Sequence, residues 1–153
     1  MYNLIKTIEK RVSLTMLDTL PKNKKIILFD GVCNLCNSSI NYVIDHDKND
    51  TFRFVALQSD LGELIQEYIG IENKSLDTII LYVPDEAYYI KSTAAIKVMR
   101  EFLGFWKLTQ IFLILPSPIR DLVYNYIAKN RYRWYGKKES CRIPTPELKA
   151  KFL

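Results

Sequence analysis

Apolar residues along the chain form short continuous runs that alternate with segments of helical spacing. The run 26–29 (IILF) is continuously apolar, which is typical of a strand buried on both faces. The segment 51–56 (TFRFVA) is rich in β-branched and aromatic residues and predicts a second strand. Apolar residues recur at helical spacing in 40–44 between these strands and in 61–69 after them. The first half is therefore predicted as strand, helix, strand, helix.

The second half predicts a hairpin followed by a helix. The segment 78–83 (TIILYV) has the strongest strand pattern in the chain, and the turn residues 84–86 (PDE) separate it from a second strand at 88–90. Ser92 is a candidate N-cap for a helix over 93–102. The resulting order, βαβ and then ββα, predicts an α/β fold with a thioredoxin-like core.

Both ends of the chain extend this core. Helical spacing of apolar residues followed by a polar stretch predicts an N-terminal helix and linker over 1–24, ahead of a core over 25–104. The remainder, 105–153, is predicted as a helical C-terminal extension in which Pro116 and Pro118 divide one helix from the next. Because 153 residues with a 48% hydrophobic fraction suit one compact core, we assign all three parts to a single domain.

Charge and cysteine content narrow the class of protein. The net charge of +5, from 22 basic and 17 acidic side chains, is too mild for a dedicated nucleic-acid binder. Residues 1–20 lack the features of a secretory signal, and the apolar stretch 102–115 is shorter than the roughly 20 residues of a membrane-crossing helix. Three cysteines, an odd number, argue against a disulfide-stapled secreted scaffold. We therefore expect a cytoplasmic protein with reduced thiols.

The cysteine pair Cys33 and Cys36 opens a predicted helix directly after the first strand. Unpaired amides and the positive end of the helix dipole favour a thiolate on the first sulfur, so Cys33 is the expected nucleophile. Cys36 lies one turn further on the same face, where its sulfur can attack a mixed disulfide. This pattern predicts a redox-active pair with Cys36 as the resolving cysteine.

Two other interpretations of the pair are a half zinc site and an incidental pair of buried thiols. Completion of a zinc site would draw on His46 and Cys141. His46 lies ten residues beyond Cys36 on the predicted helix, a rise of roughly 15 Å. Zinc ligands must lie ~2.0 to 2.3 Å from the ion, so these residues do not form one site and we expect no metal.

Asp30 lies three residues before Cys33, at the end of the first strand. Its carboxylate has two possible roles: it accepts a proton from Cys36 during resolution, or it satisfies the amides of the turn. A carboxylate this close also opposes thiolate formation on Cys33. The motif alone leaves both roles of Asp30 open.

The octet 29–36 (FDGVCNLC) resembles the signature of the DCC family of thiol-disulfide oxidoreductases, which is named for its Asp-x-x-Cys-x-x-Cys motif. The resemblance covers roughly residues 25 to 141, and its further matches are 57–59 (LQS), 77–79 (DTI), 92–94 (STA), 120–124 (RDLVY), 128–132 (AKNRY) and Cys141. It implies a thioredoxin-like fold and thiol-disulfide exchange, with Asp30, Cys33 and Cys36 as the catalytic positions. It implies no cofactor beyond the redox-active disulfide.

The chain departs from thioredoxins at the start of the hairpin. Thioredoxins place a cis-proline there, beside the cysteines, whereas this chain has 76–78 (LDT). We hypothesise that Asp77 and Thr78 occupy this position, face the active site and contact the substrate. The alternative is that Asp77 bonds its own turn.

A basic and aromatic cluster occupies the last predicted helix and its end, and consists of Lys129, Arg131, Tyr132, Arg133, Trp134, Tyr135, Lys137, Lys138 and Arg142. Such residues either complement the helix dipole and cover the core, or bind an acidic protein or a membrane surface. Outside this cluster, Cys141 is expected to be buried and inert, and His46 to be solvated rather than catalytic.

The sequence thus favours a thiol-disulfide oxidoreductase that acts on a protein or small-molecule thiol or disulfide. The alternative class is a non-catalytic binding module, with structural cysteines and a basic C-terminal surface that contacts an acidic protein or a membrane. Redox activity requires an accessible Cys33 sulfur with a low pKa, whereas a binding module does not.

Overall fold

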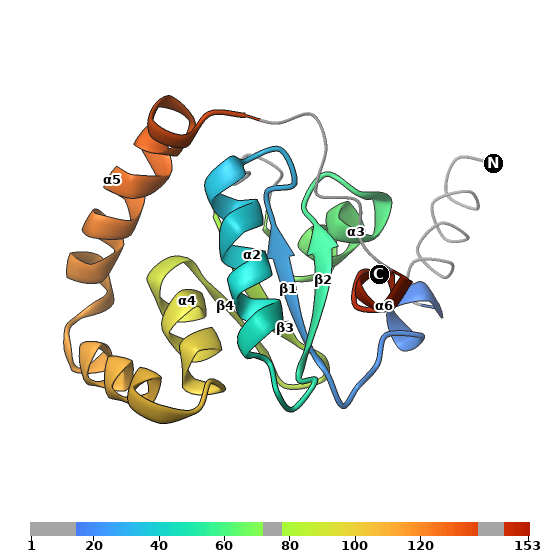
Figure 1. Ribbon diagram of the computed structural model, residues 1–153. Helices are drawn as coiled ribbons and strands as arrows, with labels where there is room; N and C mark the ends of the chain where they lie inside the picture. Colours follow the sequence, from blue (N-terminus) through green and yellow to red (C-terminus); the bar gives the residue numbers. More distant parts are fainter. Residues whose placement is uncertain (1–14, 72–77, 138–145) are drawn as a thin grey trace.

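A four-stranded mixed sheet forms the centre of the protein (Figure 1). The computed structural model describes residues 15–71, 78–137 and 146–153. The strands are β1 (Lys25–Phe29), β2 (Phe52–Ala56), β3 (Ile80–Val83) and β4 (Ala87–Ile90), in the order β2-β1-β3-β4. β1 and β2 are parallel, and β1 pairs with β3 and β3 with β4 in antiparallel register. This arrangement confirms the thioredoxin-like fold and the predicted hairpin.

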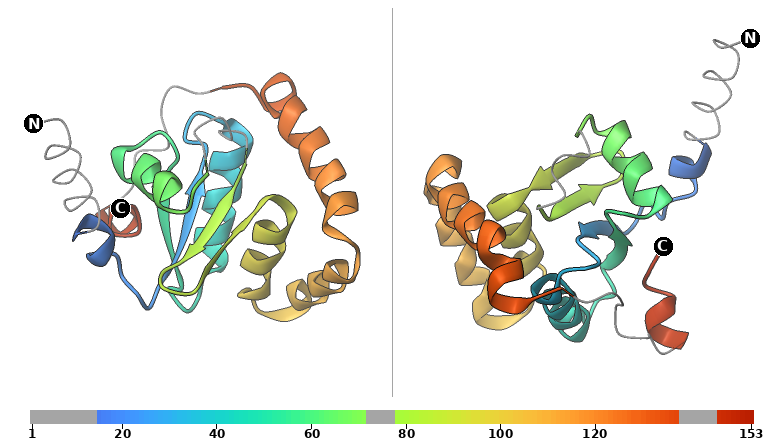
Figure 2. Two further views of the ribbon diagram at one scale, coloured as in Figure 1. Left: turned by 180° about the vertical axis from the view of Figure 1, so that it is seen from behind. Right: turned by 90° about the horizontal axis from the view of Figure 1, so that it is seen from above.

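Helices cover both faces of this sheet (Figure 2). On one face α2 (Asn34–His46) and α4 (Lys91–Arg100) contribute to a buried cluster with β1, β2 and β3. On the other face α3 (Asp60–Tyr68) joins a second buried cluster. Further helical elements are η2 (Gly104–Ile114), which is a 3-10 helix, α5 (Ser117–Tyr135) and the short α6 (Pro146–Lys149).

The β1 strand explains why the sheet requires helices on both sides. Ile27 and Phe29 belong to the cluster beneath α2 and α4, whereas Ile26 and Leu28 belong to the cluster beneath α3. Successive side chains of a strand point to opposite faces, so a continuously apolar strand is stable only when both faces are covered. The prediction of a doubly buried strand is confirmed.

The start of α4 differs from the prediction. The helix begins at Lys91 with Ile90 in the N-cap position and no side-chain cap, so the assignment of Ser92 as the N-cap is wrong. The Ser92 hydroxyl donates a hydrogen bond to the carboxylate of Asp121 on α5 and accepts one from Arg120. A serine near a predicted helix start is a capping candidate by local pattern, but here its hydroxyl is used in a contact with α5.

The elements after α4 are helical, as expected, but more tightly wound at first. The 3-10 helix η2 begins at Gly104, which has a φ of 81°. Pro116 and Pro118 stand at the start of α5, which extends to Tyr135. Along α5 the chain returns to contact both α4 and α2. Among the described residues, no helix is both long enough and apolar enough to cross a membrane.

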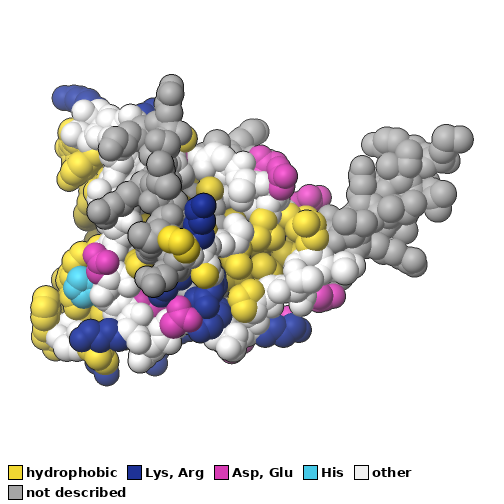
Figure 3. All heavy atoms as spheres, turned by 45° about the vertical axis from the view of Figure 1, so that its right-hand side comes forward, with side chains coloured by type: hydrophobic (Ala, Val, Ile, Leu, Met, Phe, Trp, Pro, Cys, Tyr) yellow, Lys and Arg dark blue, Asp and Glu magenta, His cyan; other side chains and the backbone are white. Residues whose placement is uncertain are grey.

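The end of the chain covers the outer edge of β2. The amide of Phe54 donates to the carbonyl of Lys151 at 2.9 Å, and the amide of Leu153 donates to the carbonyl of Phe54 at 3.0 Å. Lys151 also contacts Asp50, which in turn binds Lys24. Acidic and basic side chains accordingly lie next to each other on the lower part of the face in Figure 3. Pairing by the tail blocks an edge that would otherwise be free to bind another strand.

At the other end, residues 15–18 are helical. The rest of the predicted N-terminal helix lies outside the described residues.

Candidate functional site

The cysteine pair lies where β1 ends and α2 begins. Cys33 is the N-cap of α2, with extended backbone angles of φ −88° and ψ 121°, and its sulfur accepts a hydrogen bond from the amide of Cys36 at 3.3 Å. Both cysteines are free thiols. An amide that points at the sulfur, together with the positive end of the helix dipole, stabilises negative charge on Cys33.

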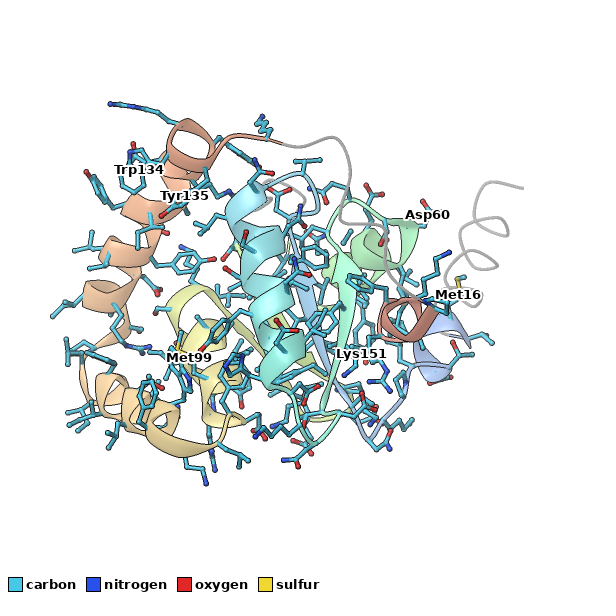
Figure 4. All side chains as sticks on the ribbon, viewed as in Figure 1. Met16, Asp60, Met99, Trp134, Tyr135 and Lys151 are labelled. Carbon is cyan, nitrogen blue, oxygen red and sulfur yellow. The ribbon has the colours of Figure 1, made fainter. Side chains whose placement is uncertain are left out.

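The accessible sulfur is the reverse of the expected one. Cys33 is fully buried, with 0% exposure, whereas Cys36 is partly exposed. The end of α5 covers the start of α2: the side-chain amide of Asn34 donates to the carbonyl of Tyr135 at 2.8 Å, and Cys33 forms an isolated antiparallel bridge with Lys137. Figure 4 labels Tyr135 at this end of α5. The expectation of an accessible Cys33 fails because of this long-range contact.

Asp30 is the centre of a buried polar network. Its carboxylate accepts hydrogen bonds from the amide of Val32 at 3.1 Å and from the side chain of Gln58 at 2.7 Å. The guanidinium of Arg131 binds the other oxygen at 2.6 Å, and the hydroxyl of Tyr132 donates to the same oxygen. These bonds support the turn-satisfying role among the two that the sequence left open for Asp30.

The ion pair between Asp30 and Arg131 is almost fully removed from solvent, with relative exposures of 2% and 3%. It connects the end of β1 to α5 across 101 residues of chain. Arg131 therefore does not belong to the surface cluster in which sequence reasoning placed it. Gln58 and Tyr132 were also not identified as site residues, although all three lie in segments that carry the family resemblance.

Several titratable groups around the pair have raised pKa values. Burial raises the pKa of the Cys36 thiol strongly, and the hydrogen bond and electrostatic interaction with Cys33 raise it further, while Arg131 opposes the shift. Burial and the hydrogen bond to Asp30 raise the pKa of Tyr132 to about 12. At neutral pH, Cys36 and Tyr132 thus both hold their protons.

A cavity of about 530 Å³ lies between α2, α4, η2 and α5. Cys36, Asp30, Thr78 and Arg131 line it together with a larger, mainly apolar set: Phe29, Leu35, Ser38, Ser39, Ile40, Tyr42, Val43, Ile79, Ala95, Val98, Met99, Phe102, Trp106, Tyr124, Ile127 and Ala128. Met99 of this set is labelled in Figure 4. The structure thus brings Thr78 to the same cavity as Cys36, whereas Asp77 lies outside the described residues.

The other residues considered from sequence lie elsewhere or are not described. His46 stacks on Tyr42, with ring centroids 3.9 Å apart, and its Nδ1 lies 2.8 Å from the Tyr42 carbonyl oxygen. Lys137 lies over the ring of Tyr132 at 4.3 Å. Cys141, Lys138 and Arg142 lie outside the described residues. Within residues 15–71, 78–137 and 146–153, no three His, Cys, Asp or Glu side chains are grouped so as to hold a metal ion.

Fold and site together define a thioredoxin-like domain with a Cys-x-x-Cys pair at the start of a helix. A family model described as DCC1-like thiol-disulfide oxidoreductase matches residues 27–137. The chain belongs to this family.

Two curated relatives are similar over most of the chain. It is 43% identical over 129 residues to "Uncharacterized protein YuxK" of Bacillus subtilis (strain 168), covering 84% of this chain and 93% of the relative. It is 39% identical over 121 residues to "DCC family protein At1g52590, chloroplastic" of Arabidopsis thaliana, covering 78% of this chain and 70% of the relative. No solved structure matches the chain.

The ion pair generates a prediction about stability. We expect Arg131→Met to lower the free energy of unfolding by about 3–5 kcal/mol, because it leaves Asp30 charged, buried and without its cation. The exposed Arg133→Met serves as the matched control on the same helix, with an expected change within about 0.5 kcal/mol. Urea unfolding measures the change in the free energy of unfolding for both variants. Adding Asp30→Asn to Arg131→Met is expected to cost less than the sum of the single changes, and strict additivity would contradict the pairing.

The raised pKa of Cys36 generates a prediction about reactivity. In reduced Cys141→Ser protein, alkylation of Cys36 by iodoacetamide is expected to be slow at pH 7 and to keep rising beyond the pKa of about 8.5 of a free thiol. The alkylation rate rises with pH because a raised pKa leaves little reactive thiolate at neutral pH. Peptide mass spectrometry measures the rate at each pH, with N-acetylcysteine as the reference. A plateau below pH 8 would contradict the raised pKa of Cys36.

Proposed function

We propose that this protein is an enzyme of thiol-disulfide exchange that works through a reversible Cys33–Cys36 disulfide, without a further cofactor. The observation that carries the proposal is the environment of the pair: Cys33 at the N-cap of α2 with an amide at 3.3 Å from its sulfur, and Cys36 on the wall of a cavity. One sulfur is placed to hold negative charge, and the other is placed to meet a substrate. A buried structural pair would need neither.

The surrounding residues have distinct roles in this proposal. Asp30 holds the turn before Cys33 and, through Arg131, the helix α5 that closes one side of the cavity. Thr78 lines the cavity beside Cys36 and is proposed to contact the substrate. Asp77 remains a proposed substrate contact from its position next to Thr78. The cytoplasm, where thiols are kept reduced, is the compartment we propose for such a protein.

The test is whether the pair forms a reversible disulfide. We expect Cys141→Ser protein to form one intramolecular disulfide on mild oxidation and to interconvert with the dithiol in mixtures of reduced and oxidised glutathione. Mass spectrometry after acid quenching and alkylation measures the oxidised fraction. The same protein carrying Cys33→Ser or Cys36→Ser serves as the matched control and forms no intramolecular disulfide. A pair that never closes, or never reopens in excess glutathione, would overturn the proposal.

A second candidate function is attachment to a membrane surface, which the outer side of η2 and α5 favours. Thirteen large apolar side chains of this region are exposed, among them Leu108 at 73% and Ile114 at 80%, and the full set is Phe105, Leu108, Ile111, Phe112, Ile114, Leu115, Ile119, Leu122, Val123, Tyr126, Ile127, Trp134 and Tyr135. Residues 102–137 also contain six basic residues and one acidic residue, and five of the basic residues lie outside the buried pair of Asp30 and Arg131. An apolar helix surface with flanking positive charge fits an anionic bilayer surface.

Vesicle binding tests this second candidate. We expect the protein to sediment with vesicles containing phosphatidylserine at least about tenfold more than with pure phosphatidylcholine, because each basic residue near the surface contributes about 1 kcal/mol. The double change Phe105→Ser and Leu108→Ser should abolish sedimentation, whereas Tyr68→Ser, an exposed apolar residue on α3, should not. Binding to polyglutamate but not to vesicles would instead indicate an acidic protein partner.

A further inference from the structure

The cavity beside Cys36 carries an inference about the substrate. Its volume of about 530 Å³ lies within the roughly 300–1,000 Å³ of small-molecule sites and is too small for a folded protein surface. Side chains of Phe29, Val98, Met99, Phe102 and Trp106 make up much of its wall. A ligand with a hydrocarbon body would bury its surface there.

Charge in the cavity further restricts the ligand. Among the described residues that line it, the charged side chains are Asp30 and Arg131, and these bind each other at 2.6 Å. A buried cation already paired with a carboxylate offers little to a second anion, because moving a charged group out of water costs several kcal/mol. The cavity therefore favours an uncharged ligand over a thiol that bears carboxylates, such as glutathione.

The positions of the two sulfurs determine where a substrate can bond. Cys36 lines the cavity, whereas Cys33 is fully buried beneath the end of α5. Thiol-disulfide exchange requires a direct approach of one sulfur to another, and it is faster when the departing sulfur is the better leaving group. The sulfur of Cys33 accepts a hydrogen bond from the Cys36 amide at 3.3 Å, so Cys33 is the sulfur placed to depart as a thiolate.

We propose that the substrate of this protein is a small, uncharged, mainly hydrocarbon dithiol or its cyclic disulfide, which binds in the cavity and bonds to Cys36 rather than to Cys33. The inference rests on the proposed function, whose substrate class it names. It reverses the roles that the spacing of the motif suggests: Cys36 receives the substrate, and Cys33 is the leaving and resolving sulfur.

The exchange takes place in two steps. A substrate thiolate attacks the Cys36 sulfur of the protein disulfide, the Cys33–Cys36 bond breaks, and its electron pair leaves on Cys33. The second thiolate of the substrate then attacks the substrate sulfur that is bonded to Cys36, which releases Cys36 to take up a proton. The substrate becomes a cyclic disulfide and the protein a dithiol, so two electrons pass from substrate to protein.

The experiment uses the full chain with Cys141→Ser in its disulfide form and two probe thiols, 1-pentanethiol and 2-mercaptoethanesulfonate. Each reaction is quenched with acid, alkylated and mapped by peptide mass spectrometry, and each rate is divided by the rate of the same thiol with a small aliphatic disulfide. We expect pentanethiol on Cys36, the alkyl label on Cys33, and a normalised rate at least about tenfold above that of the anionic thiol.

Variants on α5 and α4 test whether the preference for pentanethiol over the anionic thiol depends on the cavity. Ala128→Phe fills the cavity and is expected to remove the preference for pentanethiol, as is Ala95→Leu from α4. Val123→Phe adds similar bulk to the same helix at a side chain with 61% exposure, and it should leave the preference intact. Urea unfolding of each variant shows that the fold is retained, and agreement of the two filling variants separates a filled cavity from a local distortion.

The remaining outcomes each decide the question. Recovery of pentanethiol on Cys33 would overturn the assignment of Cys36, and equal normalised rates for the two thiols would overturn the substrate class, while the proposed function would stand in both cases. The substrate class alone would likewise be overturned if the protein reduced lipoamide no faster than oxidised glutathione, or oxidised dihydrolipoamide no faster than reduced glutathione. Failure of the pair to close into a disulfide would overturn the proposed function and this inference together.

Discussion

The buried ion pair between Asp30 and Arg131 is the contact on which the rest of the site depends. Asp30 directly follows the strand that leads to the cysteine pair, and Arg131 lies near the end of α5. With relative exposures of 2% and 3%, neither charge is hydrated, so each needs the other. The pair therefore fixes the position of α5 along the axis of α2. In this position α5 closes one side of the cavity.

That position of α5 has opposite effects on the two sulfurs. The last turn of the helix and the following residues cover Cys33, through the bonds of Asn34 to Tyr135 and the bridge to Lys137. One turn further along α2, Cys36 is left beside the cavity. The same helix thus protects the sulfur that an amide stabilises and gives access to the sulfur whose pKa is raised by burial and by its partner. Access to the cavity and the hydrogen bond from an amide are thus divided between the two cysteines.

Local pattern was sufficient for the elements of the core and insufficient for their long-range contacts. The continuous apolar run at 26–29 and the hairpin residues 78–90 predicted strands that the sheet contains, because burial on both faces and turn chemistry act within a few residues. Ser92 satisfied the local rule for an N-cap, but its hydroxyl bonds to Asp121, 29 residues away. Local spacing cannot indicate such a partner.

The same distinction applies to the candidate site. Asp30 and the cysteine pair were identified because their chemistry lies within seven residues, and Thr78 was identified by analogy with a known fold. Arg131 was assigned to a surface cluster, since a basic residue among other basic residues normally complements a helix end. Its burial follows from a partner 101 residues earlier in the chain. An acidic residue predicted at the end of a buried strand requires a cation or several donors, so the search for a distant arginine is the step that sequence reasoning lacked.

Helix α5 also relates the cavity to the outer surface of the protein. Its inner side contributes Ala128 and Arg131 to the cavity wall, while Leu122, Val123 and Tyr126 are exposed on its outer side. A helix in water normally buries its apolar side and exposes its polar side, so apolar residues on both sides of α5 are costly unless each side has a function. A hydrocarbon substrate inside and a membrane surface outside would account for both sides. Each can be tested separately, because Ala128→Phe fills the cavity, whereas Phe105→Ser with Leu108→Ser changes exposed residues that do not line it.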